Sequence, residues 1–207
     1  MCSAPRGYRS VDPEDLVKPE GMRGKDGTEM SATPLRETVV AAGQRTFTFV
    51  QFGPLPVISL RHVGSFRTLE RTWRDLTGYT DACGLTRGAQ LIGVVYDDPA
   101  HVPADLLRYD ACVAVPGAGP DVLPRLPGGE LPVRYETLGP VWAWRTTHHG
   151  PLDSLSDTYR RSLDSTAFQE QGVVAPCPRP PFYETYRSGL GTATADESWV
   201  DLHLPVP

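Results

Sequence analysis

Lysine is almost absent from this chain. Lys18 and Lys25 are its only lysines, so the sequence after Lys25 offers no amine for a Schiff base. Basic residues are also in the minority, with 20 Lys and Arg against 25 Asp and Glu. Binding to a nucleic acid backbone calls for a basic surface, so we expect no nucleic acid partner.

Long apolar runs and closely spaced cysteines are missing as well. No apolar stretch reaches the ~18 residues of a membrane helix, and no signal peptide is recognisable, so we expect a cytoplasmic protein without a membrane partner. No C-x-x-C pair, Walker loop, dinucleotide-binding motif or Ser-His-Asp signature occurs, which predicts no metal site and no cofactor. The four cysteines are scattered and are expected to be free thiols: Cys2, Cys83, Cys112 and Cys177.

Glycine and proline, by contrast, are abundant, with 20 and 21 copies and no Gly-X-Y period. Both residues interrupt helices, so a fold with short elements and many turns is favoured. Residues 1–40 combine charges with Pro and Gly and have few apolar positions. That composition predicts a disordered N-terminal tail, and we expect one folded domain over residues 41–207.

The chain contains an internal repeat. At an offset of 86 residues, Gly53-Pro54 matches Gly139-Pro140, and His62 matches His148. At an offset of 90 and then 91 residues, the matches continue to the C-terminus. We infer two copies of one module, about residues 46–116 and 131–207. The main further matches are Trp73 with Tyr159, Tyr96 with Tyr186, and Asp110 with Asp201.

Both copies have the same predicted order of strand, helix, strand, strand, which is an α+β fold. Apolar residues at helical spacing follow Ser65 in the first copy and begin at Pro151 in the second. We expect the copies to pair edge to edge in one antiparallel sheet that carries both helices, with a ligand groove between them. The expected strands are 46–52, 57–62, 91–96, 109–115, 131–137, 141–148, 182–187 and 199–206.

Residues that only one copy has are freer to serve function than residues that both copies share. By this criterion Trp73 and Tyr159 are predicted core residues, and His62 and His148 are predicted to bond the turn backbone. The unmatched residues are Trp142 (against Pro56), Trp144 (against Ile58), His149 (against Val63) and Glu184 (against Val94). Glu184 lies in an aromatic run, Phe182–Tyr186, where a carboxylate suits a cationic or polarised ligand. The alternative is that Glu184 simply faces solvent.

These residues also carry a family resemblance. Five segments together resemble the GyrI-like small-molecule-binding domain: Val57–Gly64, Gly93–Pro99, Leu107–Val113, His148–Pro151 and Phe182–Tyr186. This domain is the effector-binding part of AraC-type regulators such as Rob and is related to that of BmrR. The resemblance covers residues 44–207. It implies two pseudo-symmetric modules around a multidrug-binding groove, with Glu184 as the binding glutamate. The segment Val141-Trp142-Ala143-Trp144 departs from the family pattern and implies a narrower or more aromatic groove.

Three functions follow as hypotheses. The first is a free-standing protein that binds a hydrophobic, cationic or electrophilic compound, with these contact residues: Glu184, Trp142, Trp144, Tyr96, Tyr109, Tyr183 and His149. The second is a hydrolase that adds water to cyclopropane-bearing antibiotics and so gives drug resistance, with Glu184 as general base and Tyr186 or Tyr96 as hydrogen-bond donor. The third is a protein-interaction module, such as a modulator of gyrase.

Overall fold

The computed structural model describes residues 38–42, 45–85, 87–119, 131–188 and 198–207. The predicted tail lies outside the described residues except for its last three positions, and strand β1 begins at Val39 within it. Within the described ranges no helix is long and apolar enough to cross a membrane.

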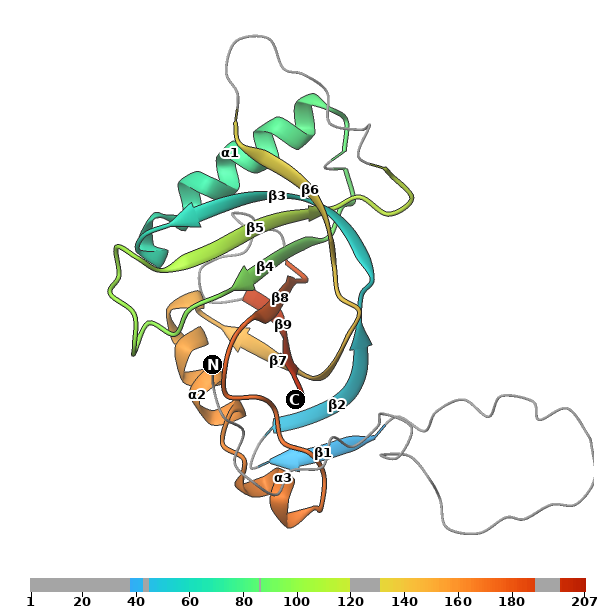
Figure 1. Cartoon of the computed structure of the whole chain (residues 1–207), viewed down its shortest axis with the longest axis vertical. Coiled ribbons are helices and arrows are strands. Elements are labelled where there is room, and N and C mark those ends of the chain that lie inside the picture. The colour runs from blue at the N-terminus through green and yellow to red at the C-terminus, as the bar shows by residue number, and fades with distance from the viewer. Residues whose placement is uncertain (1–37, 43–44, 86, 120–130, 189–197) are drawn as a thin grey trace, which may run out of the picture. The chain divides into compact units, whose positions relative to one another are not determined.

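In the described part of the chain the strands form one antiparallel sheet of nine strands, in the order β1-β2-β7-β9-β8-β4-β5-β3-β6 (Figure 1). The pairing of β4 with β8 joins the first half of the chain to the second. Two further pairings also join the halves: β3 of the first half pairs with β6 of the second, and β2 of the first half pairs with β7 of the second. The strands are β1 (Val39–Ala42), β2 (Arg45–Phe52), β3 (Leu55–Val63), β4 (Leu91–Val95), β5 (Arg108–Ala114), β6 (Val133–Leu138), β7 (Val141–Gly150), β8 (Phe182–Tyr186) and β9 (Ser198–Pro205).

The two predicted helices are present, each opening with a short 3-10 turn. In the first half η2 (Phe66–Thr68) leads into α1 (Leu69–Ala82), and the Ser65 side chain accepts a hydrogen bond from the backbone N–H of Arg67, 3.3 Å away. In the second half η4 (Leu152–Ser154) leads into α2 (Leu155–Ser162). A third helix, α3 (Thr166–Glu170), was not predicted from the sequence.

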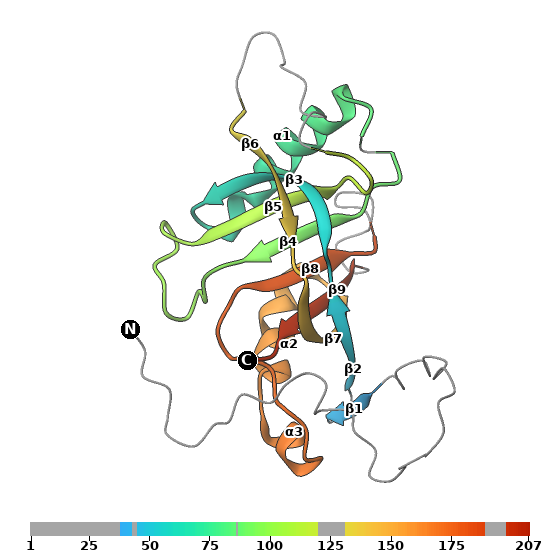
Figure 2. The ribbon, with the colours of Figure 1, turned by 45° about the vertical axis from the view of Figure 1, so that its right-hand side comes forward.

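Both main helices pack on the same face of the sheet, which we call the helix face. Its core contains Trp73 and Leu76 from α1, Leu155 and Tyr159 from α2, and strand residues between them. A separate apolar cluster, which includes Phe52, Val94 and Tyr183, lies on the opposite face, here called the back face. Figure 2 shows the strands of both halves side by side in this sheet.

Two histidines attach the helices to the sheet in the same way. The hydroxyl of Thr72 in α1 lies 2.9 Å from Nδ1 of His62, and the hydroxyl of Thr158 in α2 lies 2.8 Å from Nδ1 of His148. The other ring nitrogen of each histidine bonds a carbonyl of the following turn, at 3.1 and 3.2 Å. The predicted bond from each histidine to the turn backbone is therefore present.

The two Gly-Pro turns press against each other. Gly53 and Gly139 have φ values of 76° and 73°, in the left-handed region that glycine tolerates. A Cβ on Gly53 would overlap the carbonyl oxygen of Leu138, and a Cβ on Gly139 would overlap that of Phe52. Glycine is therefore required at both turns by conformation and by space.

Candidate functional site

The carboxylate of Glu184 lies inside the protein, surrounded by tyrosine hydroxyls. Its side chain is on the helix face of β8, and the residue is only 3% exposed. Tyr186 donates to Oε2 at 2.7 Å and Tyr109 donates to the same oxygen at 3.0 Å. Tyr159 donates to Oε1 at 2.9 Å. We call Glu184 with these three tyrosines the Glu184 cluster.

The residues of the cluster come from three elements of the fold, and a fourth element leaves space for them. Tyr186 stands two residues after Glu184 on β8, and the alternation of a strand puts both side chains on one face. Tyr109 comes from β5 and Tyr159 from α2. The position opposite Glu184 on β4 is Gly93, and a Cβ there would overlap the hydroxyl of Tyr109 and approach Oε2 of Glu184 to 2.8 Å. A glycine on β4 thus makes the space that the cluster fills.

Helix α1 also reaches the cluster. The ring of Trp73 meets Tyr186 edge-on, with centroids 5.6 Å apart, and meets Tyr109 at 6.3 Å. Edge-to-face contacts of this kind are favourable between aromatic rings. Glu184 is therefore surrounded by side chains from α2, β5 and β8, and Trp73 of α1 packs on the rings of two of them.

Burial dominates the electrostatics of the site. It raises the pKa of Glu184 above the ordinary glutamate value, because an ionised carboxylate loses its hydration, while the three tyrosine hydrogen bonds act in the opposite direction. Burial also raises the pKa of Tyr109, Tyr159 and Tyr186 well above the ordinary value, so all three stay neutral hydroxyl donors. Among the described residues, no arginine, lysine or histidine forms an ion pair with Glu184.

Two predicted site residues belong to the Glu184 cluster: Tyr109, which was predicted as a ligand contact, and Tyr186, which was predicted as the hydrogen-bond donor of a hydrolase. Tyr96 and Tyr183 do not, because they lie with the back-face cluster. Tyr183 stacks on Phe52 there, with centroids 4.5 Å apart. The sequence comparison also set Glu184 against Val94, but the Val94 side chain belongs to the back face, and Gly93 is the β4 residue that faces Glu184.

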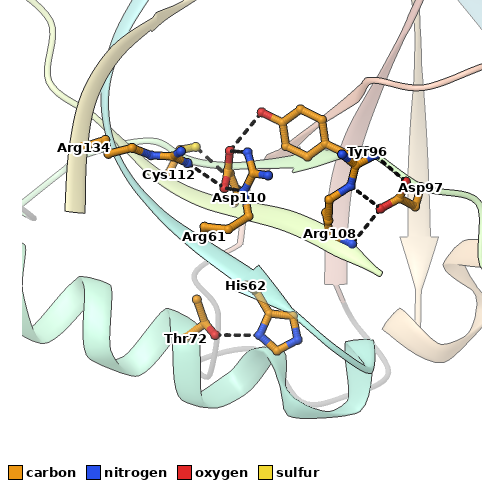
Figure 3. A network of polar contacts seen from close by, with 9 residues as sticks. All are labelled: Arg61, His62, Thr72, Tyr96, Asp97, Arg108, Asp110, Cys112 and Arg134. Carbon is orange, nitrogen blue, oxygen red and sulfur yellow. Dashed lines mark hydrogen bonds and ion pairs between the residues drawn. The ribbon is translucent and has the colours of Figure 1, made fainter. Parts of the chain in front are cut away.

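The hydroxyl of Tyr96 bonds a different carboxylate, that of Asp110, at 2.9 Å (Figure 3). Asp110 has no exposed surface and also accepts hydrogen bonds from Arg61 and, at 3.2 Å, from Arg134. The guanidinium of Arg61 lies over the Tyr96 ring, 4.4 Å from its centroid. Tyr96 is thus held in a back-face ion-pair network and not beside the Glu184 cluster.

The two predicted tryptophans are on the helix face but belong to another aromatic group. Trp142 stacks on Phe49 with centroids 5.2 Å apart, and Trp144 contacts Phe49 and Phe168. The indole N–H of Trp144 donates to the carbonyl of Val174 at 2.7 Å. His149 is exposed and packs on Trp199, 4.2 Å between centroids. None of these three residues is among the described hydrogen-bond partners of Glu184, which are the three tyrosines of the cluster.

Tyr159 is the functional candidate that sequence reasoning missed. Its match with Trp73 suggested that both are core residues, and the Tyr159 ring does pack against Phe182. The difference between the two matched residues was the usable signal, since only tyrosine brings a hydroxyl. In the structure that hydroxyl donates a hydrogen bond to Glu184.

The described part of the chain contains no group of three or more His, Cys, Asp or Glu side chains placed to hold a metal ion. What the Glu184 cluster does offer is one ionisable oxygen pair, three hydroxyls and several aromatic rings in a buried setting. Such a site suits recognition of an organic molecule or proton transfer to one.

Fold and comparison together define a small-molecule-binding domain. The chain belongs to the GyrI-like family: the model of the GyrI-like small molecule binding domain matches residues 45–206. No curated protein matches the chain.

Solved structures share the fold. The EcmrR C-terminal domain is 18% identical, with a TM-score of 0.61 over 79% of this chain and 98% of that one. A hydrolase from Listeria innocua is 13% identical, with a TM-score of 0.59 over 77% of this chain and 90% of its own. An uncharacterized conserved protein from Listeria innocua is also 13% identical, with a TM-score of 0.58 over 77% and 91%. At such identities the likeness extends to the fold alone.

Proposed function

We propose that this domain captures hydrophobic small molecules, cationic or electrophilic ones among them, with Glu184 as the electrostatic anchor. The observation that carries the proposal is a 3%-exposed carboxylate whose hydrogen-bond partners are three neutral hydroxyls. A buried carboxylate without a counter-charge gains free energy from a cation that comes close to it. The rings around it add attraction for a cation or a flat molecule.

The ligand would lie on the helix face, between α1 and α2. Its immediate walls would be Tyr109, Tyr159 and Tyr186, because their hydroxyls already surround Glu184, with Trp73 packed on the rings of Tyr109 and Tyr186. Trp142 and Trp144 are on the same face and would contact a larger ligand. The other predicted contacts, from the back face or the exposed surface, are not part of this proposal: Tyr96, Tyr183 and His149.

The test is a titration of a fluorescent lipophilic cation into the wild type and Glu184→Gln. A hydrogen bond or ion pair to a buried charge contributes about 1.5–3 kcal/mol, so the variant is expected to lose roughly tenfold or more in affinity. Glu70→Gln is the matched control, since it makes the same substitution on the exposed surface of α1. Equal affinities for wild type and Glu184→Gln would reject the anchor.

A second candidate function is hydrolysis of a strained, electrophilic compound such as a cyclopropane-bearing antibiotic. The raised pKa of Glu184 favours it, because a general base works best when its pKa is near the working pH. In this reaction Glu184 would take a proton from water while Tyr186 donates to the oxygen on which charge develops. Mass spectrometry of the compound after incubation tests this second function: added water supports hydrolysis, and recovery of intact compound after long incubation rejects it.

We also propose that the folded domain, residues 41–207, consists of two copies of one module. The strand registers support this: Arg61 pairs with Asp110 in the first half, and Thr147 pairs with Asp201 in the second, at offsets of 86 and 91 residues. The register of β4 with β5 and of β8 with β9 carries the same offset of 91 to the central strands. With this offset of 91 residues the counterpart of Glu184 is Gly93, so only the second copy has the carboxylate.

A further inference from the structure

Four oxygen–oxygen contacts meet in the Glu184 cluster. Oε1 of Glu184 lies 2.9 Å from the Tyr159 hydroxyl, and Oε2 lies 2.7 Å from that of Tyr186 and 3.0 Å from that of Tyr109. The fourth contact joins the hydroxyls of Tyr109 and Tyr186, also at 3.0 Å. All four distances are within the range of O–H···O hydrogen bonds.

The number of protons in the cluster depends on the state of Glu184. A hydrogen bond needs one proton between its two oxygens, and each tyrosine supplies one. With an ionised carboxylate, three hydroxyl protons serve four contacts, so two lone pairs face each other in one of them. A protonated carboxyl adds a fourth donor, and every contact then has its proton.

The surroundings of the cluster also favour the protonated carboxyl of Glu184. The groups that face Glu184 are hydroxyls from β5, β8 and α2, Leu202 from β9 and Gly93 from β4, while the indole of Trp73 from α1 packs on the rings of two of the tyrosines. None of these groups carries a positive charge. An ionised carboxylate that is buried without a cation is costly, whereas a neutral acid with full hydrogen bonding is not.

We propose that Glu184 is a neutral carboxylic acid in the ligand-free protein, at pH values where ordinary glutamates are ionised, and that capture of a lipophilic cation expels its proton. The O–H bond of the carboxyl breaks, the proton leaves to the buffer, and the carboxylate remains beside the ligand. One positive charge enters and one leaves, so the net charge of the buried site does not change. This inference rests on the proposed function and adds a proton exchange to it.

The first experiment is calorimetric titration with methyltriphenylphosphonium, a cation that does not titrate itself, in two buffers of different ionisation enthalpy. At about pH 5.5, above the ordinary glutamate pKa of about 4.3, we expect release of close to one proton per bound cation. The number should fall towards zero as the pH rises and Glu184 ionises in the free protein. Binding to the wild type without proton release at about pH 5.5 would overturn the inference.

The second experiment needs no ligand. An infrared difference spectrum at about pH 5.5, wild type minus Glu184→Gln, is expected to contain the C=O band of a protonated carboxyl. Tyr135→Phe is the matched control, because it removes a tyrosine hydroxyl that bonds Ala118 and should leave that band unchanged. Presence of the band without cation binding rejects the proposed function but keeps the neutral acid. Absence of the band rejects the neutral acid, whatever the protein binds.

Discussion

At the scale of single residues, Glu184 gives the stability of the protein a pH dependence. Its folded-state pKa lies above its unfolded value, so the folded protein binds the extra proton. The stabilising contribution of that proton is complete below the unfolded pKa of about 4.3 and is lost as the pH rises through the folded pKa. The sign is opposite to that of a carboxylate held in an ion pair.

Glu184→Gln should therefore remove one source of destabilisation at neutral pH. We expect the unfolding free energy of the wild type, relative to this variant, to fall as the pH rises from the unfolded pKa of Glu184 through its folded pKa. The fall should be about 1.4 kcal/mol for each unit by which the pKa is shifted. Urea unfolding at a series of pH values measures the difference. Parallel curves for the two proteins at all pH values would show that Glu184 titrates normally.

Gly93 is the residue on which the geometry of the cluster depends most directly. In Gly93→Ala the new methyl group would occupy the position of the Tyr109 hydroxyl, and Tyr109 is packed at 2% exposure with little room to move. We expect a loss of about 1–3 kcal/mol in stability, as for overpacking of a core, together with weaker cation binding. Gly78→Ala in α1 is the control: its Cβ meets open space, so a gain of about 0.5–1 kcal/mol is expected in urea unfolding.

At the scale of elements, the back-face carboxylate of Asp110 connects β5 to β3, β6 and the end of β4. It receives hydrogen bonds from Arg61, Arg134 and Tyr96 while having no exposed surface. Asp110→Asn would leave two guanidiniums without their counter-charge, but Arg61 and Arg134 are 31% and 49% exposed, so water offsets part of the loss and we expect a cost of about 1–3 kcal/mol. Urea unfolding should show this loss, whereas Glu70→Gln at an exposed pair on α1 should stay within about 0.5 kcal/mol. A small effect of Asp110→Asn would mean that hydrogen bonding alone, without charge, holds these strands.

Elements with a clear period could be predicted from the sequence, and short ones could not. Alternation and the Gly-Pro breaks locate β2 and β3, and the apolar stripe through Trp73 locates α1. The strand β1 and the helix α3, with four and five residues, are too short to show a period. Glu184 could be singled out because a carboxylate is unusual in an aromatic run.

The partners of Glu184 were harder to predict, because they depend on which face of the sheet each residue occupies. The sequence comparison set Glu184 against Val94, whereas the residue that pairs with Glu184 across β4 and β8 is Gly93, and on a strand a shift of one position exchanges the two faces. The same rule separates Tyr183 and Tyr96 from Tyr186 and Tyr109. Only the hydrogen-bonded register of β4 with β8 decides between these arrangements, and it is set by long-range pairing.

At the scale of the whole molecule, the two halves are coupled where the Gly53 and Gly139 turns touch. Gly53→Ala and Gly139→Ala each place a methyl group onto a backbone carbonyl of the opposite turn, at φ values near the left-handed region. The conformational cost alone is about 1–2 kcal/mol, and the overlap with rigid backbone adds to it, so we expect more than about 3 kcal/mol for each variant. Gly84→Ala is the matched control, because Gly84 has a φ of 70° but open space around its Cβ, and should lose only about 1–2 kcal/mol.

The double variant distinguishes a shared contact from two separate strained turns. If each methyl group forces the same pair of turns apart, the second substitution enters a gap that the first has already opened. The double variant should then lose less stability than the two single losses added together, by about 0.5 kcal/mol or more, when all four proteins of the cycle are unfolded in urea. Simple additivity would mean that each turn relaxes by itself and that the halves are coupled through strand pairing, of β4 with β8, β3 with β6 and β2 with β7.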